Sequence, residues 1–194
     1  MRKHASALVL SLLAACASSP PSEFYTLSGE GAPRLAPVAE SRARVVVGPA
    51  LVPESVDRPQ LVLRLSENRV KIVETARWAE PLDRAIARVL AEDLAQELGS
   101  SSVMTYPQDV ERFDYQVLVE VLRFESVLGE AATVDVAWTV RPQNGEARIG
   151  RSAVREEVRG AGNEALVAAH SRALRAVAGE IARTIRAPVR EAAY

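Results

Sequence analysis

Two stretches of the chain repeat their apolar residues with the spacing of an amphipathic helix. The first begins at Pro81 and keeps its leucine, isoleucine and valine side chains on one stripe until Gly99. Proline suits a helix start because its missing N–H is not needed there, and glycine commonly follows the last turn. The second stretch has Asn163 as the expected N-cap and Pro188 as its stop. The pattern predicts two helices, each with one buried face.

Shorter β-favouring segments predict strands. Residues 43–48 form a β-branched run, and residues 61–73 have the alternation of a hairpin. Three longer strands are expected at residues 115–124, 133–140 and 149–158. In the middle one, Val134, Val136, Trp138 and Val140 alternate with Thr133, Asp135, Thr139 and Arg141, as in a meander with one buried face. Residues 24–27 are expected to add an edge strand.

These elements together predict an α/β fold, a mixed β-sheet with two main amphipathic helices packed on it. We divide the chain into a signal peptide (1–15), a lipidated cysteine with a flexible tether (16–41), a single domain (42–188) and a C-terminal tail (189–194). The tether is assigned because residues 17–41 are rich in Ser, Pro, Gly and Ala, and such a composition buries too little apolar surface to fold.

The N-terminus has the order of a bacterial export signal. Arg2 and Lys3 precede an apolar stretch, and small residues precede Cys16. The stretch is shorter than the roughly 20 residues that span a bilayer. Cys16 is the only cysteine, which leaves no partner for a disulfide within the chain. The sequence Leu13-Ala14-Ala15-Cys16 resembles the lipobox of bacterial lipoproteins, which implies cleavage before Cys16 and acylation of its thiol. An ordinary secretory signal with a chance cysteine is the alternative.

The residue after the cysteine bears on the membrane that would hold the anchor. Enteric bacteria retain lipoproteins in the inner membrane through an aspartate at this position, where the present chain has Ala17. By that resemblance, the expected location is the periplasmic face of the outer membrane. Each buried acyl CH₂ contributes about 0.8 kcal/mol, so three acyl chains would give a stable anchor.

Charge and motifs exclude several functions. Without Arg2 and Lys3, the mature chain has 22 Lys and Arg against 25 Asp and Glu, a net charge near −3. It therefore has no basic surplus for nucleic acid. The sequence has no glycine-rich phosphate loop, no metal-ligand spacing and no nucleophile elbow, so no catalytic residue, metal or cofactor is predicted. His170 lies on the apolar stripe of the last helix and is expected to be structural, because no nucleophile is indicated for it.

Several motifs taken together resemble the ABC-type transport auxiliary lipoproteins, the PqiC-like family of proteobacterial envelopes. The matching segments are Phe24-Tyr25-Thr26-Leu27, Val47-Gly48-Pro49, Val56-Asp57-Arg58-Pro59-Gln60-Leu61-Val62 and Trp78-Ala79-Glu80-Pro81-Leu82, followed by both helices. The resemblance spans nearly the whole mature chain, and the Asp57 and Trp78 segments are its most specific parts. Tyr106-Pro107-Gln108 departs from the family pattern, because relatives often carry an aromatic residue after the proline.

The resemblance implies a non-enzymatic subunit of an intermembrane lipid transport system, with a fold similar to the TolB amino-terminal domain. Its partners would be an MCE-domain periplasmic protein with its inner-membrane permease, the outer membrane through the acyl chains, and a second copy of the chain. The candidate partner or self-contact residues are Asp57, Arg58, Pro59, Gln60, Trp78, Glu80 and Pro81. A structural envelope lipoprotein and a lipid-anchored hydrolase are the alternatives.

Both specific motifs also allow a purely structural interpretation. Trp78 can be a lid packed over the core, with Glu80 favouring the positive end of the following helix. Asp57 can accept hydrogen bonds from nearby backbone N–H groups in a turn. Neither interpretation excludes a docking surface at the same place.

Overall fold

The described part of the chain, residues 20–29, 43–106 and 113–187 of the computed structural model, contains eight strands and two helices. In chain order they are β1 (Glu23–Tyr25), β2 (Val45–Leu51), β3 (Gln60–Ser66), β4 (Arg69–Trp78), α2 (Leu82–Leu98), β5 (Val103–Thr105), β6 (Tyr115–Val127), β7 (Ala131–Pro142), β8 (Arg148–Glu157) and α3 (Gly162–Arg186). The α/β class expected from the sequence is confirmed. Cys16 and Pro188 lie outside the described residues, so what was predicted for them stays a prediction.

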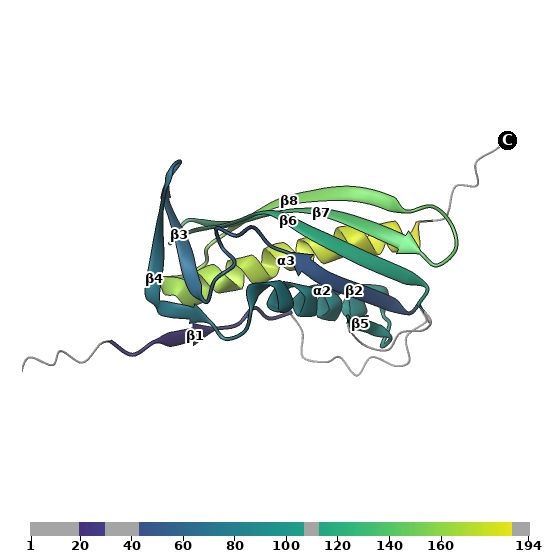
Figure 1. The fold of residues 1–194 in the computed structure, drawn as a ribbon, viewed down its shortest axis with the longest axis horizontal. Coiled ribbons are helices and arrows are strands. Elements are labelled where there is room, and N and C mark those ends of the chain that lie inside the picture. Colours follow the sequence, from purple (N-terminus) through teal and green to yellow (C-terminus); the bar gives the residue numbers. More distant parts are fainter. Residues whose placement is uncertain (1–19, 30–42, 107–112, 188–194) are drawn as a thin grey trace, which may run out of the picture.

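The larger of two sheets has five strands in the order β5-β2-β6-β7-β8. Strand β2 is parallel to β5 and β6, whereas β6, β7 and β8 form an antiparallel meander, so the sheet is mixed as predicted. Both helices pack on one face, α2 against β2 and β5 and α3 against β7 and β8 (Figure 1). The main core lies between the helices and this sheet.

The remaining strands form a second sheet in the order β1-β4-β3, where the sequence pattern indicated a single sheet. The alternation of apolar residues along a strand indicates which face of that strand is buried, but it does not indicate which other strand pairs with it. Strand β1 pairs in parallel with β4 at an edge, which confirms the expected edge strand. The β3–β4 hairpin projects from the end of the molecule where β1 lies, and α3 ends at the opposite end (Figure 1).

The start of α2 is close to the prediction. Pro81 is the residue before the helix, and Leu82 is its first residue. The carbonyl of Pro81 accepts the backbone N–H groups of Arg84 and Ala85, which begins the helical ladder. At the other end Gly99 has a φ of 62°, a left-handed conformation that glycine adopts without strain, and it ends the helix as expected.

The prediction that Asn163 caps the last helix is wrong. Helix α3 begins one residue earlier, at Gly162, and has no side-chain cap hydrogen bond. Gly160 and Gly162 have φ values of 120° and 81°, so the chain turns at these glycines and enters the helix before it reaches Asn163. The Asn163 amide Nδ2 lies 3.5 Å from Tyr25 Oη, and this contact joins the start of α3 to β1.

The face of the large sheet that the helices do not cover carries the polar residues predicted for β7, together with the exposed Ile149 of β8, which pairs with Thr139. Asp135 in β7 lies on it but is only 5% exposed. Arg151 of the neighbouring strand covers Asp135 with hydrogen bonds of 2.8 Å and 2.6 Å to its two carboxylate oxygens. This pairing holds the pKa of Asp135 below its usual value, which keeps the buried carboxylate charged.

Candidate functional site

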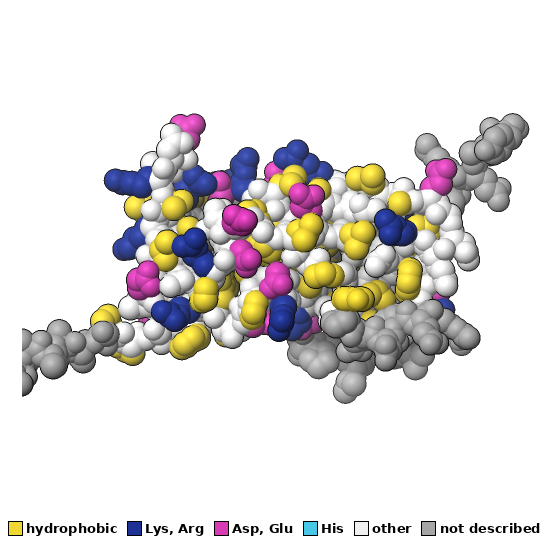
Figure 2. Space-filling view, in the orientation of Figure 1, with side chains coloured by type: hydrophobic (Ala, Val, Ile, Leu, Met, Phe, Trp, Pro, Cys, Tyr) yellow, Lys and Arg dark blue, Asp and Glu magenta, His cyan; other side chains and the backbone are white. Residues whose placement is uncertain are grey.

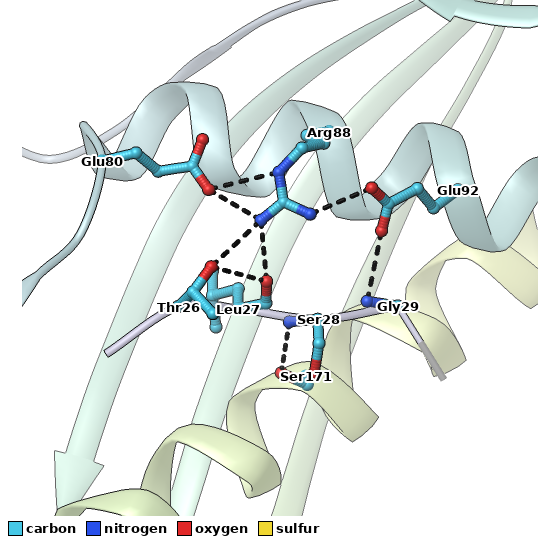
Figure 3. A network of polar contacts seen from close by, with 8 residues as sticks. All are labelled: Thr26, Leu27, Ser28, Gly29, Glu80, Arg88, Glu92 and Ser171. Carbon is cyan, nitrogen blue, oxygen red and sulfur yellow. Dashed lines mark hydrogen bonds and ion pairs between the residues drawn. The ribbon is translucent and has the colours of Figure 1, made fainter. Parts of the chain in front are cut away.

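Residues 26–29, which we call the strap, run from the end of β1 across both helices (Figure 3). The side chain of Leu27 is fully buried in the core. Complete burial of a leucine stabilises a fold by about 1.5–3 kcal/mol. The backbone N–H of Ser28 donates to Ser171 Oγ on α3 at 3.2 Å, and that of Gly29 donates to Glu92 Oε2 on α2 at 3.4 Å. The strap therefore fastens the N-terminal segment to both helices.

A charged cluster on the α2 side, which we call the clasp and which consists of Glu80, Arg88 and Glu92, holds the strap in place. Arg88 Nη2 donates to the Leu27 carbonyl oxygen at 2.7 Å and to Thr26 Oγ1 at 3.3 Å. The guanidinium also pairs with Glu80 at 2.7 Å and Glu92 at 2.9 Å. Its hydrogen bond with Glu80 raises the pKa of Arg88 further above the usual range, so Arg88 stays charged.

The strap lies close to α2 at Gly29. A Cβ atom there would lie 3.0 Å from Glu92 Oε2 and 3.1 Å from Asp93 Oδ1. Contacts this short require a neighbouring side chain to move. Glycine at this position therefore lets the backbone N–H reach the Glu92 carboxylate.

Two backbone hydrogen bonds bring distant motifs together beside the strap. The N–H of Trp78 donates to the Pro59 carbonyl at 2.7 Å, and the N–H of Ala79 donates to the Tyr25 carbonyl at 2.8 Å. The Trp78 side chain is 7% exposed and meets the Phe124 ring edge-on, with centroids 6.1 Å apart. Its surroundings are those of a lid over the core rather than of an open contact surface.

The other predicted contact residues lie at this end with differing exposure. Asp57, Pro59 and Pro81 are exposed, whereas Arg58 and Gln60 are half-buried. Asp57 stands in a turn closed by its own backbone N–H, which donates to the Pro53 carbonyl at 3.0 Å. The Gln60 side chain donates to Glu74 at 3.1 Å. Glu80 is half-buried in the clasp, so the candidate contact residues that are exposed are Asp57, Pro59 and Pro81.

A serine that the sequence did not indicate lies beside His170. Ser126 Oγ on β6 is 2.8 Å from His170 Nε2 on α3, and the imidazole stacks on Phe124 with a centroid distance of 3.9 Å. The two residues are 44 positions apart in the chain, and no local motif links them. Only the packing of α3 on β6 brings the pair together.

The geometry of this pair does not suit nucleophilic catalysis. Ser126 is 5% exposed and His170 is 0% exposed, so the pair is buried, although Ser126 is among the residues that line a neighbouring hollow. Within the described residues, His170 Nδ1 has no hydrogen-bond partner, and a general base is normally oriented there by a carboxylate. Burial lowers the pKa of His170 to about 3, so the ring is neutral at physiological pH. The pair fastens α3 to β6.

A shallow hollow with a volume of about 200 Å³ lies between the β3–β4 hairpin, the turn before β3 and β6. Its lining includes Val62, Val70 and Leu122 together with Arg64 and Glu125, which form an ion pair at 2.7 Å. Across the described ranges, no group of three or more His, Cys, Asp or Glu side chains is arranged to hold a metal. In the same ranges, neither helix has the length and apolar character needed to cross a bilayer.

Replacing Arg88 with methionine should loosen the strap. The change keeps most of the aliphatic side chain but removes the donor to the Leu27 carbonyl, and we expect a loss of about 1–2 kcal/mol in the free energy of unfolding. Hydrogen exchange should become faster at residues 26–29 in particular. Arg183→Met is the matched control, because Arg183 is exposed and its ion pair with Glu180 is long, at 3.9 Å. Equal protection of the strap in both variants would refute the role given to Arg88.

The free energy of unfolding should fall as the pH decreases below about 6.5. In the unfolded chain His170 binds a proton near pH 6.5, whereas in the folded protein the ring stays neutral down to its pKa of about 3. The expected loss between pH 7 and 4.5 is about 2–3 kcal/mol. His170→Gln should cost roughly 1–2 kcal/mol at neutral pH and abolish this slope. Chemical denaturation at several pH values measures both effects. An unchanged slope, or loss of a hydrolase activity at unchanged melting temperature, would contradict the structural assignment.

Comparison with known proteins gives a match to a family model and matches to solved structures. The model of the ABC-type transport auxiliary lipoprotein component matches residues 25–182. A crystal structure of an uncharacterised protein superimposes with a TM-score of 0.69 at 19% identity, covering 86% of this chain and 99% of that one. A Xanthomonas campestris protein gives a TM-score of 0.66 at 18% identity, covering 83% and 93% of the two chains. None of the curated proteins matches. The match runs from the last residue of β1 to Ala182 within α3, and the chain belongs to the ABC-type transport auxiliary lipoprotein family.

Proposed function

We propose that this protein is anchored through acylated Cys16 at the periplasmic face of the outer membrane and serves as a docking subunit of a lipid transport system. Its partners are an MCE-domain periplasmic protein, the permease in the inner membrane and further copies of the same chain. The observation that carries the proposal is the family match over residues 25–182. Membership of this family indicates a role in an ABC-type transport system, and the features of this chain described below support a docking role in that system.

The strap favours a role in assembly. A domain hung on a long flexible tether would transmit no orientation from its anchor to its partners. Here the chain is fixed by Leu27 in the core and by Arg88 on α2, eleven residues after Cys16. Such a connection suits a subunit that must present one surface in a defined direction.

The absence of accessible chemistry among the described residues favours docking over catalysis. The Ser126–His170 pair is buried, and the hollow beside β3 is lined by an arginine and a glutamate that already pair with each other. Asp57, Pro59 and Pro81 are the exposed ones among the predicted contact residues, and they are the candidate contacts with a partner or a second copy. A closed ring of copies would repeat one weak contact many times.

Cys16→Ser should abolish the anchor. Without the thiol no diacylglycerol can be attached, so the protein should leave the outer-membrane fraction or accumulate as an unprocessed precursor. Membrane fractionation and mass spectrometry of the N-terminus check this, with wild type as the control. A variant that is processed normally and stays in the outer membrane would show that the anchor lies elsewhere.

Asp57→Arg should weaken capture of the MCE-domain protein or of a second copy, because it reverses the charge of an exposed motif residue without touching the core. Glu146→Arg is the control, since it makes the same charge change in the exposed turn at the opposite end. Pull-downs with the detergent-solubilised lipoprotein compare the two. Trp78→Ala is a poorer probe because the side chain is buried. If the folded Asp57→Arg variant captures its partners as well as the wild type does, the docking surface does not include this motif.

A further inference from the structure

Strand β8 forms a free edge of the large sheet. It stands last in the strand order, and no described strand pairs with it on the side away from β7. In an edge strand every second residue directs its N–H and C=O groups outward, where another strand can bond to them. Figure 1 shows β8 along the upper border of the molecule, and Figure 2 shows apolar side chains beside Lys and Arg on that border.

The features that usually protect an edge from pairing are missing from β8. Natural edge strands are commonly short, bulged or interrupted by proline. Strand β8 has ten residues without a proline, and its register with β7 is unbroken. Charged side chains are another protection, but most of those on β8 are turned toward groups of their own molecule. The three ion pairs are Arg151–Asp135, Arg155–Glu130 and Glu156–Arg172.

Ser152 lies in the middle of β8 and marks the face that is turned to the helices. Its hydroxyl group donates to Glu180 on α3 and accepts the N–H of Trp138. Residues at even positions of β8 share this face, whereas Ile149, which is 80% exposed, lies on the face that the helices leave open. If a second β8 pairs antiparallel with the first and keeps its helices on the same side, even positions stand opposite even positions.

The charges of β8 distinguish between the registers that such a pair can adopt. With Ser152 opposite Ser152, Arg148 of each copy stands opposite Glu156 of the other, and Ile149 stands opposite Arg155. Opposite charges in direct opposition stabilise a strand pair. The registers centred on either neighbour of Ser152 put one arginine opposite another, which is destabilising. Charge complementarity therefore favours the register centred on Ser152.

Helix α3 leaves room for a second copy beside this edge. It packs against both β7 and β8, so it lies about one strand spacing, about 4.8 Å, from a two-fold axis at the free edge. The two α3 helices are then about 10 Å apart, within the range of about 8–10 Å for packed helices. Ala176 is one turn from Arg172 and one turn from Glu180, which both bond to β8, and it is exposed. A small side chain is therefore present where the two helices approach each other.

We propose that two copies of this chain join their large sheets through antiparallel pairing of β8 with β8, around a two-fold axis at Ser152. The five strands of each copy then form one continuous sheet, with the two α3 helices side by side near Ala176. This contact names the surface for the self-association contained in the proposed function and rests on that function. It uses none of Asp57, Pro59 and Pro81, which stay free for the MCE-domain partner.

The first test introduces cysteines at positions that stand opposite each other in this register. Neighbouring antiparallel strands bring opposite Cα atoms to about 4.5–5.5 Å, a separation that a disulfide spans. We expect acylated protein in detergent with both Ile149→Cys and Arg155→Cys to form a covalent dimer under mild oxidation. The two single variants and wild type are the matched controls. They should remain uncrosslinked, because equal positions are about 20 Å apart in this register.

The second test disturbs the approach of the two helices. Ala176→Arg adds a long cation on each side of the axis and should raise the dissociation constant of the dimer about tenfold or more, measured from its mass at several concentrations. Gln96→Arg is the control, because it adds the same charge to an exposed position of α2 and should leave the dimer unchanged. The melting temperature of each variant verifies that it is folded.

Three results would overturn the proposal. They are a double variant that does not cross-link, equal cross-linking of a single variant, and a dimer that Ala176→Arg leaves intact. A dimer that dissociates with Asp57→Arg instead would also overturn it, since the contact between copies would then lie at that motif. Failure of the proposed function is recognised separately, as wild type that lacks the acylated mass or does not capture the MCE-domain protein.

Discussion

The contacts of Arg88 connect the N-terminal strap to helix α2, 61 positions further along the chain. Its guanidinium pairs with two carboxylates on or beside α2 and donates to the Leu27 carbonyl, and Glu92 also accepts the N–H of Gly29. Exposed ion pairs are usually worth little, but here the geometry is fixed by a helix and by the burial of Leu27 next to it. The clasp and the apolar anchor support each other, because the charged contacts position the backbone that carries Leu27 into the core.

The second sheet follows from the same arrangement. Strand β1 can pair with β4 only where the strap holds it, and the Tyr25 and Pro59 carbonyls then accept the N–H groups of Ala79 and Trp78. The small sheet thus closes one end of the helix layer, while the large sheet covers its length. A molecule built in this way has two chemically different ends, one joined to the N-terminus and one formed by the β7–β8 turn and the end of α3.

Buried polar side chains such as Ser126, His170 and Asp135 are each matched to a neighbour and serve to fasten elements together. In the function proposed above, the strap would fix which end of the domain lies next to Cys16.

The sequence by itself determined the local elements, because apolar spacing, glycine and proline act within a few residues of where they stand. It predicted both helices, the meander, the hairpin and the edge strand, and motif resemblance identified the family. It did not reveal the division into two sheets, the start of α3, the clasp of Glu80 and Arg88 around the strap, or the meeting of Ser126 with His170. Those depend on contacts between residues far apart in the chain, such as Arg88 with Leu27 across 61 positions, and no local pattern encodes them. Only the packing of the helices on the sheets brings such partners within hydrogen-bond distance, and that packing decided how the N-terminal segment is held.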